Sequence, residues 1–514
     1  MTPPTLPLRL HLLGEPISHE ESPVAVDTFG GRIHVEWSPQ AAVTPLGQLP
    51  FFVEFLKTAD LFDPWVADCP LLYRSPNAPE VRDILGTTML SILAGQKRYA
   101  HIAAIRADGV NPALLGMSKV ASEDSVRRAF KAMDKEACAA WQGQHLRRCY
   151  EALLVEPWIL DVDTTIKTVY GHQEGAVVGY NPHKPGRPSH TYHTYFVANL
   201  RLVLDVEVQA GNRTAAKYTS PGLFSFLDAL PRALWPAFAR GDCAFGNEGV
   251  MVDCEKRALD YLFKLRQTKK VRALIAGLFE RADWCDAGQG WQGVASSLRL
   301  MGWSRERRVI VLRREVKENV LLENKKEDGQ LEFAFMETVG TTKKYEYAVL
   351  VTSLEAGVLT LAQHYRDRAD SENPFDELKN HWGWGGFTTQ DLGRCQIMAR
   401  HTALFYNWWN LFSRLAVPEK HIEAMTSRPL LLHAVGKQTQ HAGQTILTLT
   451  SMHAESGRIQ RALRDLTGFL RGLREAAEQL DWAGRWSRIL ARAFVAFLKG
   501  RPLGVPERQV IGAT

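Results

Sequence analysis

Two aspartates each follow a short apolar run that is typical of a β-strand. Asp163 ends residues 158–163, and Asp242 follows the run that begins at Phe238. Carboxylates at strand ends reach the crevice in which open α/β sheets bind ligands. Two such carboxylates and a third acid are the ligands that a pair of Mg²⁺ ions prefers, and such ion pairs support phosphoryl transfer. An ordinary turn is the alternative interpretation, because aspartate is common in turns.

A third acid lies in a segment with helical spacing. The steps from Tyr365 to Arg368, Glu372 and Lys379 are three, seven and fourteen residues, which predicts four side chains on one face of a helix. A ring, a guanidinium, a carboxylate and an ammonium on one face suit a DNA strand end, for stacking, bidentate phosphate contact, metal ligation and a point charge. A solvated, salt-bridged helix is the alternative.

A basic segment nearer the N-terminus is a second candidate for DNA contact. Ser122 is predicted to cap a helix that carries Arg127 and Arg128. Together with the short turn opened by Asn111, this helix suits a helix-turn-helix whose second helix presents cations. A solvated basic face on an amphipathic helix is the alternative.

The elements around the two aspartates follow one another in α/β order. The run that ends at Asp163 is followed by two alternating strands within residues 191–209, a helix, the strand before Asp242, a helix from Asn247 and a strand at residues 261–265. This order predicts an α/β core with acids at strand ends.

Hydrophobic periodicity predicts six parts of the chain. These are an N-terminal arm with one strand (1–45), a helical DNA-binding domain (46–156), the first part of the core (157–266), a β-rich insertion with strands at 307–314, 331–335 and 345–351 (267–355), the last part of the core (356–416), and a helical basic C-terminal region (417–514).

The composition excludes several classes of protein. The 514 residues are 45% hydrophobic and 23% charged, which is a globular profile, and the net charge of +6 is only mildly basic. The seven cysteines are scattered without C-x-x-C pairs, so a disulfide framework and a structural zinc are not expected. No apolar run reaches the roughly 18 residues of a membrane span, and we expect a cytoplasmic protein.

The ordered motifs resemble the bacterial insertion-sequence DDE transposases that carry the YREK signature. The Y-x2-R-x3-E-x6-K spacing, Asp163-Thr-Thr165 and Arg240-Gly-Asp242 carry this resemblance. Residues 170–175, 179–188 and 382–387 resemble one group of the IS-four-like superfamily, the IS-thirteen-eighty group. The similarity runs from about residue 51 to residue 416.

The resemblance implies a ribonuclease H-like core in which two Mg²⁺ ions, replaceable by Mn²⁺, are held by Asp163, Asp242 and Glu372. It also implies a β-strand insertion between the second acid and the glutamate. An insertion tryptophan would receive a flipped base beside the cleavage point, and the candidates are Trp284, Trp291 and Trp303.

By the same resemblance, Tyr365, Arg368 and Lys379 contact the element-end strand. Pro374 departs from a regular helix, because it lacks the amide that bonds to the Asp370 carbonyl. The helix is expected to kink there or to restart with Asn373 as cap, which makes the direction of Lys379 less secure.

Asp161 competes with Asp163 for the first position of the acid set. We prefer Asp163, because Thr165 then follows at the D-x-T spacing of the family.

The resemblance implies a transposase that binds inverted-repeat ends of double-stranded DNA, cleaves by metal-dependent hydrolysis and joins the 3′-hydroxyl to target DNA. It further implies a hairpin intermediate, cut-and-paste excision and a homodimer that synapses two ends. A catalytically inactive, transposase-derived DNA-binding protein is the first alternative, and a stand-alone metal nuclease on the same core is the second.

Overall fold

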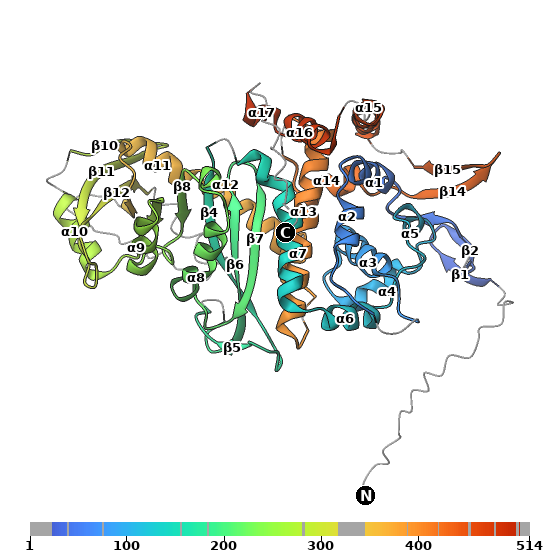
Figure 1. Cartoon of the computed structure of the whole chain (residues 1–514), viewed down its shortest axis with the longest axis horizontal. Helices are drawn as coiled ribbons and strands as arrows, with labels where there is room; N and C mark the ends of the chain where they lie inside the picture. The colour runs from blue at the N-terminus through green and yellow to red at the C-terminus, as the bar shows by residue number, and fades with distance from the viewer. Residues whose placement is uncertain are drawn as a thin grey trace, which may run out of the picture. The chain divides into compact units, whose positions relative to one another are not determined.

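The computed structural model contains a mixed sheet that has ten strands among the described residues (Figure 1). Asp163 lies in one interior strand of this sheet, and Asp242 directly follows the neighbouring interior strand. Five neighbouring strands run in the order β7-β6-β4-β8-β9. β6 is antiparallel to β4 and β7, whereas β8 and β9 are parallel to β4. Their bounds are Ile159–Thr168 for β4, Pro188–Val197 for β6, Leu202–Ala210 for β7, Phe238–Gly241 for β8 and Asp260–Lys264 for β9.

The structure describes residues 23–38, 41–73, 77–154, 157–181, 184–279, 283–316, 345–387, 389–419, 421–450, 454–476, 480–499 and 503. The side chains of residue 220 and residues 369–373 lie outside this description. The chain divides into two units, Met1–Ala42 and Val43–Thr514. In the first unit, β1 (Val24–Thr28) and β2 (Gly31–Val35) form an antiparallel hairpin, where the sequence predicted one strand.

The interval between Asp242 and Glu372 continues the same sheet. β13 pairs antiparallel with β9, and β12, β11 and β10 follow in that order. The predicted strand at residues 331–335 lies outside the described residues. The bounds are Lys269–Phe279 for α10, Cys285–Gly288 for β10, Trp291–Leu298 for β11, Arg307–Glu315 for β12 and Tyr345–Thr352 for β13, and at the other end of the sheet β5 (Val177–Val178) pairs with β6.

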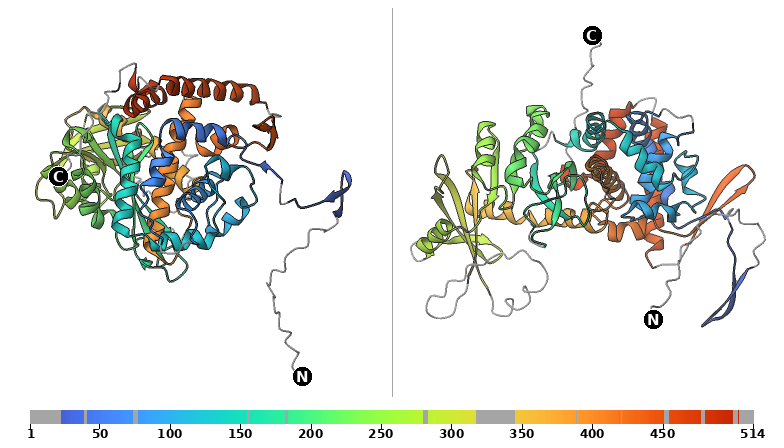
Figure 2. Two further views of the ribbon diagram at one scale, coloured as in Figure 1. Left: turned by 45° about the vertical axis from the view of Figure 1, so that its right-hand side comes forward. Right: turned by 90° about the horizontal axis from the view of Figure 1, so that it is seen from below.

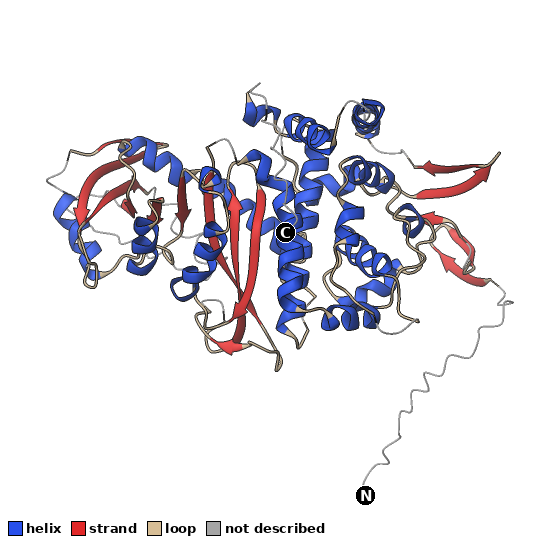
Figure 3. Ribbon diagram, in the orientation of Figure 1, coloured by secondary structure: helices blue, strands red, loops and turns tan. Residues whose placement is uncertain are grey.

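Helix α13 (Leu392–Ala416) joins the sheet to the N-terminal helices (Figure 3). It packs against β7, and also against α7 (Lys135–Tyr150) and α3 (Val81–Leu93), and nearly all its side chains are buried. The Asn407 amide bonds to both the N–H and the C=O of Val203 on β7, at 2.9 and 2.8 Å. These bonds satisfy backbone groups at a strand edge that no other described strand covers.

The other helices fall into three groups. The N-terminal group holds α1 (Leu49–Thr58), α2 (Phe62–Ala67), α4 (Ile102–Ile105), α5 (Asn111–Leu114) and α6 (Glu123–Ala132). The core group holds α8 (Ala215–Asp228), α9 (Glu248–Lys256), α11 (Val358–Arg366) and α12 (Ala369–Asn380). The C-terminal group holds α14 (Ala424–Leu431), α15 (Ser456–Glu475), α16 (Trp482–Ala493) and α17 (Val495–Leu498).

The C-terminal region contains a β-hairpin in addition to its helices. β14 (Gly436–His441) and β15 (Gln444–Leu449) form a hairpin, and β14 also pairs with β3 (Val43–Thr44). The two loop residues, Ala442 and Gly443, both have positive φ, which matches the twist of a two-residue hairpin turn. No helix in the described ranges combines the length and the apolar character needed to cross a membrane.

Candidate active site

The sheet register brings the two predicted aspartates to the same level. Val162 on β4 lies opposite Gly241 on the parallel strand β8. The next residues are Asp163 and Asp242, whose side chains therefore leave the same face of the sheet. The carboxylate of Asp242 accepts a hydrogen bond from the backbone N–H of Ala244 at 2.9 Å, which fixes its direction.

The two carboxylates repel each other. Burial and the Asp163 charge raise the pKa of Asp242 above that of an ordinary aspartate, and the Arg368 guanidinium opposes this shift. A pair of carboxylates held close together favours a cation between them. Within the described part of the chain, no three acidic, histidine or cysteine side chains form a metal-binding cluster, and the side chain of Glu372 lies outside that part.

Asp161 has a different role from Asp163. It is fully buried, and both of its oxygens accept hydrogen bonds from Arg240, from Nε to Oδ1 at 2.5 Å and from Nη2 to Oδ2 at 2.7 Å. A carboxylate with both oxygens held in this way is a poor candidate for a metal ligand. The Asp161–Arg240 pairing therefore favours Asp163 as the first acid of the predicted metal-binding set.

Arg240 also ties the strands to helix α11. Its Nη1 donates a hydrogen bond to the backbone carbonyl of His364, in the last turn of that helix. Carbonyls in a last helical turn have no partner within the helix, and a cation there interacts favourably with the helix dipole. The Asp161–Arg240 pair therefore fixes the end of α11 next to the two aspartates.

The prediction that one unbroken helix carries Tyr365, Arg368, Glu372 and Lys379 is wrong. α11 ends at Arg366 and α12 begins at Ala369, so a break at residues 367–368 separates Tyr365 from the others. Steps of three, seven and fourteen residues place side chains on one face only when the helix is unbroken. At the break, the Arg368 side chain turns to the Asp163 carboxylate, with 3.6 Å between Nη2 and Oδ1.

The expected restart at Asn373 is wrong. Pro374 lies inside α12, and the helix restarts earlier, at Ala369. A proline near the start of a helix removes only one bond of the ladder, here that to the Asp370 carbonyl.

Arg368 is buried beside the acids. Burial lowers its pKa, but Tyr365 and the carboxylates of Asp163 and Asp242 outweigh burial and raise the pKa above that of a free guanidinium. Tyr365 is half-buried in the last turn of α11. Lys379, in contrast, is exposed in the last turn of α12.

If the chain cleaves DNA as the resemblance to DDE transposases implies, truncation of Arg368 is expected to reduce DNA cleavage more than truncation of Lys379. Arg368→Ala removes a buried cation beside the aspartate pair, whereas Lys379→Ala removes an exposed point charge. Single-turnover cleavage of a short element end by the two variants measures the difference. Equal losses would show that the position of Arg368 beside Asp163 has no bearing on the reaction.

Side chains that the sequence patterns did not single out anchor α12. Glu377 is buried and accepts hydrogen bonds from His421 at 3.2 Å, Trp382 at 3.2 Å and the backbone N–H of Ala424 at 2.7 Å. Burial raises its pKa, but the bonds from His421 and Ala424 outweigh burial and hold the pKa below its usual value. Glu377 therefore fixes α12 to the start of α14 and is not available to a metal.

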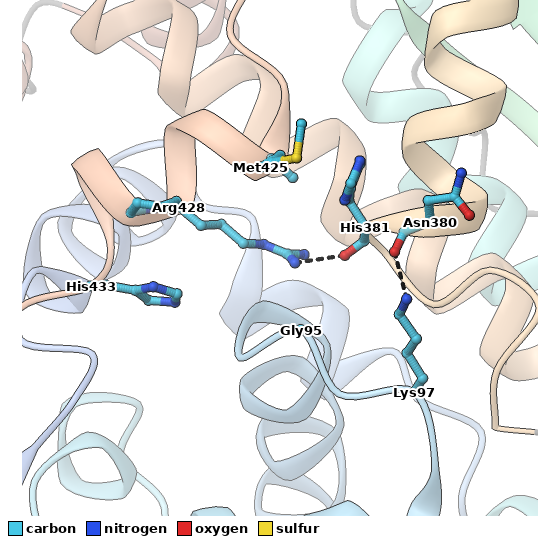
Figure 4. Close-up of a pocket in the computed structure, with 9 residues that line it drawn as sticks. Gly95, Lys97, Asn380, His381, Met425, Arg428 and His433 are labelled. Carbon is cyan, nitrogen blue, oxygen red and sulfur yellow. Dashed lines mark hydrogen bonds between the residues drawn. The ribbon is translucent and has the colours of Figure 1, made fainter.

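A pocket of about 270 Å³ lies at the C-terminal end of α12 (Figure 4). Lys97 donates to the Asn380 carbonyl at 2.6 Å, and Arg428 donates to the His381 carbonyl at 2.7 Å. Two cations thus satisfy the last carbonyls of the helix that carries Glu372.

The role of Lys167 was also not predicted from the sequence. Burial lowers its pKa to about 8, and its ammonium donates to the Gly386 carbonyl at 3.5 Å, which links β4 to the glycine-rich turn after α12. The turn is further held by the Phe387 N–H, which donates to the Lys97 carbonyl at 2.8 Å. The alternation of polar residues from Asp161 to Lys167 was the signal for this role.

The chain was compared with known protein families, curated proteins and solved structures. The family model of the transposase DDE domain, group 1, matches residues 67–469. The chain belongs to this family. No curated protein sequence matches the transposase. One similar solved structure is a cryo-EM structure of the piggyBac transposase synaptic complex with hairpin DNA, at 11% identity and a TM-score of 0.37, covering 92% of this chain and 89% of that chain.

The three insertion tryptophans of the transposase all lie against arginines. Trp303 is buried, with the Arg307 guanidinium 5.2 Å from its ring centre. Trp284 and Trp291 are half-buried, and arginines lie 4.0 and 5.0 Å from their ring centres. Trp284 and Trp291 are therefore more exposed than Trp303.

The predicted DNA-binding helix of the transposase is α6. Ser122 caps it as predicted, accepting from the N–H of Ser125 at 3.2 Å. Arg127 pairs with Asp124 at 3.4 Å and lies 5.2 Å from the ring centre of Tyr99, whereas Arg128 is exposed.

Proposed function

We propose that this transposase binds inverted-repeat ends of double-stranded DNA, cleaves them by metal-dependent hydrolysis and joins the freed 3′-hydroxyl to target DNA. The observation that carries the proposal is the pair of carboxylates, Asp163 and Asp242, at one level of adjacent parallel strands, with Arg368 buried beside them. Family membership supports the reaction class.

The finer classification is part of the proposal. The strand order β7-β6-β4-β8-β9, with three antiparallel strands followed by two parallel ones, supports a ribonuclease H-like core. The strands between Asp242 and Glu372 support an insertion at residues 267–355. The division of the chain into six parts, with the boundaries predicted from the sequence, belongs to this proposal. The Y-x2-R-x3-E-x6-K spacing supports assignment to the insertion-sequence transposases with the YREK signature.

The donor set fits two Mg²⁺ ions, with Mn²⁺ as a substitute. Asp163, Asp242 and Glu372 would hold them, because hard cations prefer carboxylate oxygens and the two described carboxylates are close enough to interact. Bound Mg²⁺ lowers the pKa of water and stabilises negative charge on phosphate oxygens.

Side chains near the metal ligands would position the DNA strand and supply positive charge to its phosphates. The Arg368 guanidinium suits a phosphate next to the aspartates, because its planar fork matches two phosphate oxygens. Tyr365, one turn earlier at the end of α11, would stack on the element-end strand, and Lys379 would add a point charge. The Asp161–Arg240 pair and the Glu377 bonds hold the two helix ends that carry these groups.

The route and the assembly rest on the YREK resemblance. We propose cut-and-paste excision through a hairpin intermediate, carried out by a homodimer that synapses two ends. The location would be the bacterial cytoplasm, at the nucleoid when bound to DNA.

A supercoiled plasmid with paired element ends, incubated with the protein and Mg²⁺ or Mn²⁺, tests this function. Excised linear element is the expected product. Binding without cuts would instead identify an inactive DNA-binding protein, and cuts without relation to the ends would identify a stand-alone nuclease.

The double variant Arg127→Ala with Arg128→Ala is expected to weaken end binding. Each lost phosphate contact lowers the slope of log K against log salt by roughly one unit. Because Arg127 is paired with Asp124, Arg128→Ala alone is expected to produce most of the change. Fluorescence anisotropy on an end duplex at several salt concentrations measures it, and an unchanged slope would mean that α6 only packs.

A further inference from the structure

Helix α15 lies at the surface, along the top of the left view in Figure 2, and buries only one of its faces. The buried face holds leucines and an isoleucine, which pack toward α1 and α13: Ile459, Leu463, Leu466, Leu470 and Leu473. At 3.6 residues per turn, the opposite side carries three arginines, three glycines and, at its C-terminal end, the exposed Glu475. We name it the arginine–glycine face: Gly457, Arg461, Arg464, Gly468, Arg471 and Gly472.

Two of the three arginines of this face have an acid four residues later, Asp465 after Arg461 and Glu475 after Arg471, but neither acid lies within ion-pair distance of them. Arg461, Arg464 and Arg471 are exposed, and no described carboxylate pairs with them. The two other arginines of α15 are paired, Arg458 with Glu455 at 3.1 Å and Arg474 with Glu54 at 2.6 Å. Arg458 and Arg474, beside the face, are therefore neutralised by ion pairs, whereas the arginines on the face can contact an anionic partner.

The glycines make the face flat. A Cβ on Gly468 or Gly472 would meet no atom within 4 Å, so nothing in the described chain requires glycine at either position. Glycine costs about 1 kcal/mol relative to alanine in a helix interior. Without side chains here, a partner can come close to the helix backbone while the arginines reach around it.

We propose that the arginine–glycine face binds the sugar–phosphate backbone of duplex DNA, without reading its sequence. Duplex DNA carries one negative charge per about 1.7 Å of its axis, which complements a row of guanidiniums about 15 Å long. A second copy of the chain is the weaker candidate, because two such faces would bring arginines against arginines. The inference rests on the proposed function only in that the chain acts on DNA.

The salt dependence of binding to a duplex of unrelated sequence tests the charge. With full-length protein and no divalent metal, the triple variant Arg461→Ala, Arg464→Ala, Arg471→Ala should lower the slope of log K against log salt by about three units. The matched control, Arg458→Ala with Arg474→Ala on the same helix, should change the slope much less. An unchanged slope in the triple variant overturns the proposal, as does a wild-type protein that does not bind this duplex.

A second variant tests the close approach. Gly468→Leu with Gly472→Leu should weaken binding at least tenfold without lowering the melting temperature, because leucine favours the helix but holds DNA away. Gly277→Leu, at an open glycine of α10, is the control that should bind normally. Unchanged DNA affinity combined with loss of a dimer in light scattering would overturn the proposal and identify an interface between copies.

These measurements are independent of cleavage. A protein that passes them but excises no element from the plasmid contradicts the proposed function and leaves this inference intact. A protein that excises the element but keeps its salt slope in the triple variant contradicts only this inference.

Discussion

Cleavage of an element end should fall by roughly a thousandfold or more when Asp163 or Asp242 is replaced by alanine, while end binding stays largely intact. Each substitution removes a carboxylate from the pair on β4 and β8, and neither removes a cation that contacts phosphate. Glu372→Ala should have the same effect. Single-turnover cleavage with Mg²⁺ measures the loss, and binding with Ca²⁺ in its place measures affinity without chemistry.

Asp376→Ala is the matched control for these variants. Asp376 is an exposed acid on α12, the helix that carries Glu372, and its loss should leave cleavage nearly unchanged. If Glu372→Ala kept near-normal cleavage of a pre-nicked end, the third acid would have to be another residue of this segment. Glu377 would remain excluded, because its carboxylate is occupied by His421, Trp382 and Ala424.

Asp161→Ala should destabilise the fold by about 3–5 kcal/mol, because it leaves the buried Arg240 guanidinium without its carboxylate. Arg240→Ala should cost a similar free energy of unfolding, since it leaves Asp161 unpaired. The double variant Asp161→Leu with Arg240→Met should recover much of that stability, because two apolar side chains leave no buried charge. Urea unfolding followed by circular dichroism measures all three.

The comparison with Asp163→Ala distinguishes a structural acid from a metal-binding one. Asp163 is partly exposed, so its replacement should alter unfolding little and abolish cleavage. If Asp161→Ala unfolded at the wild-type urea concentration and still lost cleavage, Asp161 would belong to the metal site and the assignment to Asp163 would need revision.

The placement of the aspartates was predictable because it depends on local patterns. Apolar runs ending in Asp163 and Asp242 predict strands, and parallel neighbours bring strand ends together. The same patterns contain the Asp161–Arg240 pair, two residues before each aspartate, although only the register of β4 against β8 shows that the two meet.

The break between α11 and α12 was not predictable in this way. Helical spacing assumes an unbroken helix, whereas the break accompanies contacts from other parts of the chain, those of Arg240 with His364 and of Arg368 with Asp163. The β14–β15 hairpin was missed for a different reason. Its strands are rich in polar glutamine and threonine, and its Ala442-Gly443 turn lacks the usual Asn-Gly or Asp-Gly pair.

The amide side chains of α13 can bond to β7 only while they lie on the same side of the helix. Gln396 bonds to the N–H of Val208 and the C=O of Val206, at 2.6 and 2.7 Å, and Asn407 does the same for Val203 further along. One residue inserted between Gln396 and Asn407 would rotate the two amides by about 100° relative to each other, so both could no longer face β7. The length of this helix is therefore under tighter constraint than its sequence, and insertions or fused domains belong in the loops before and after it.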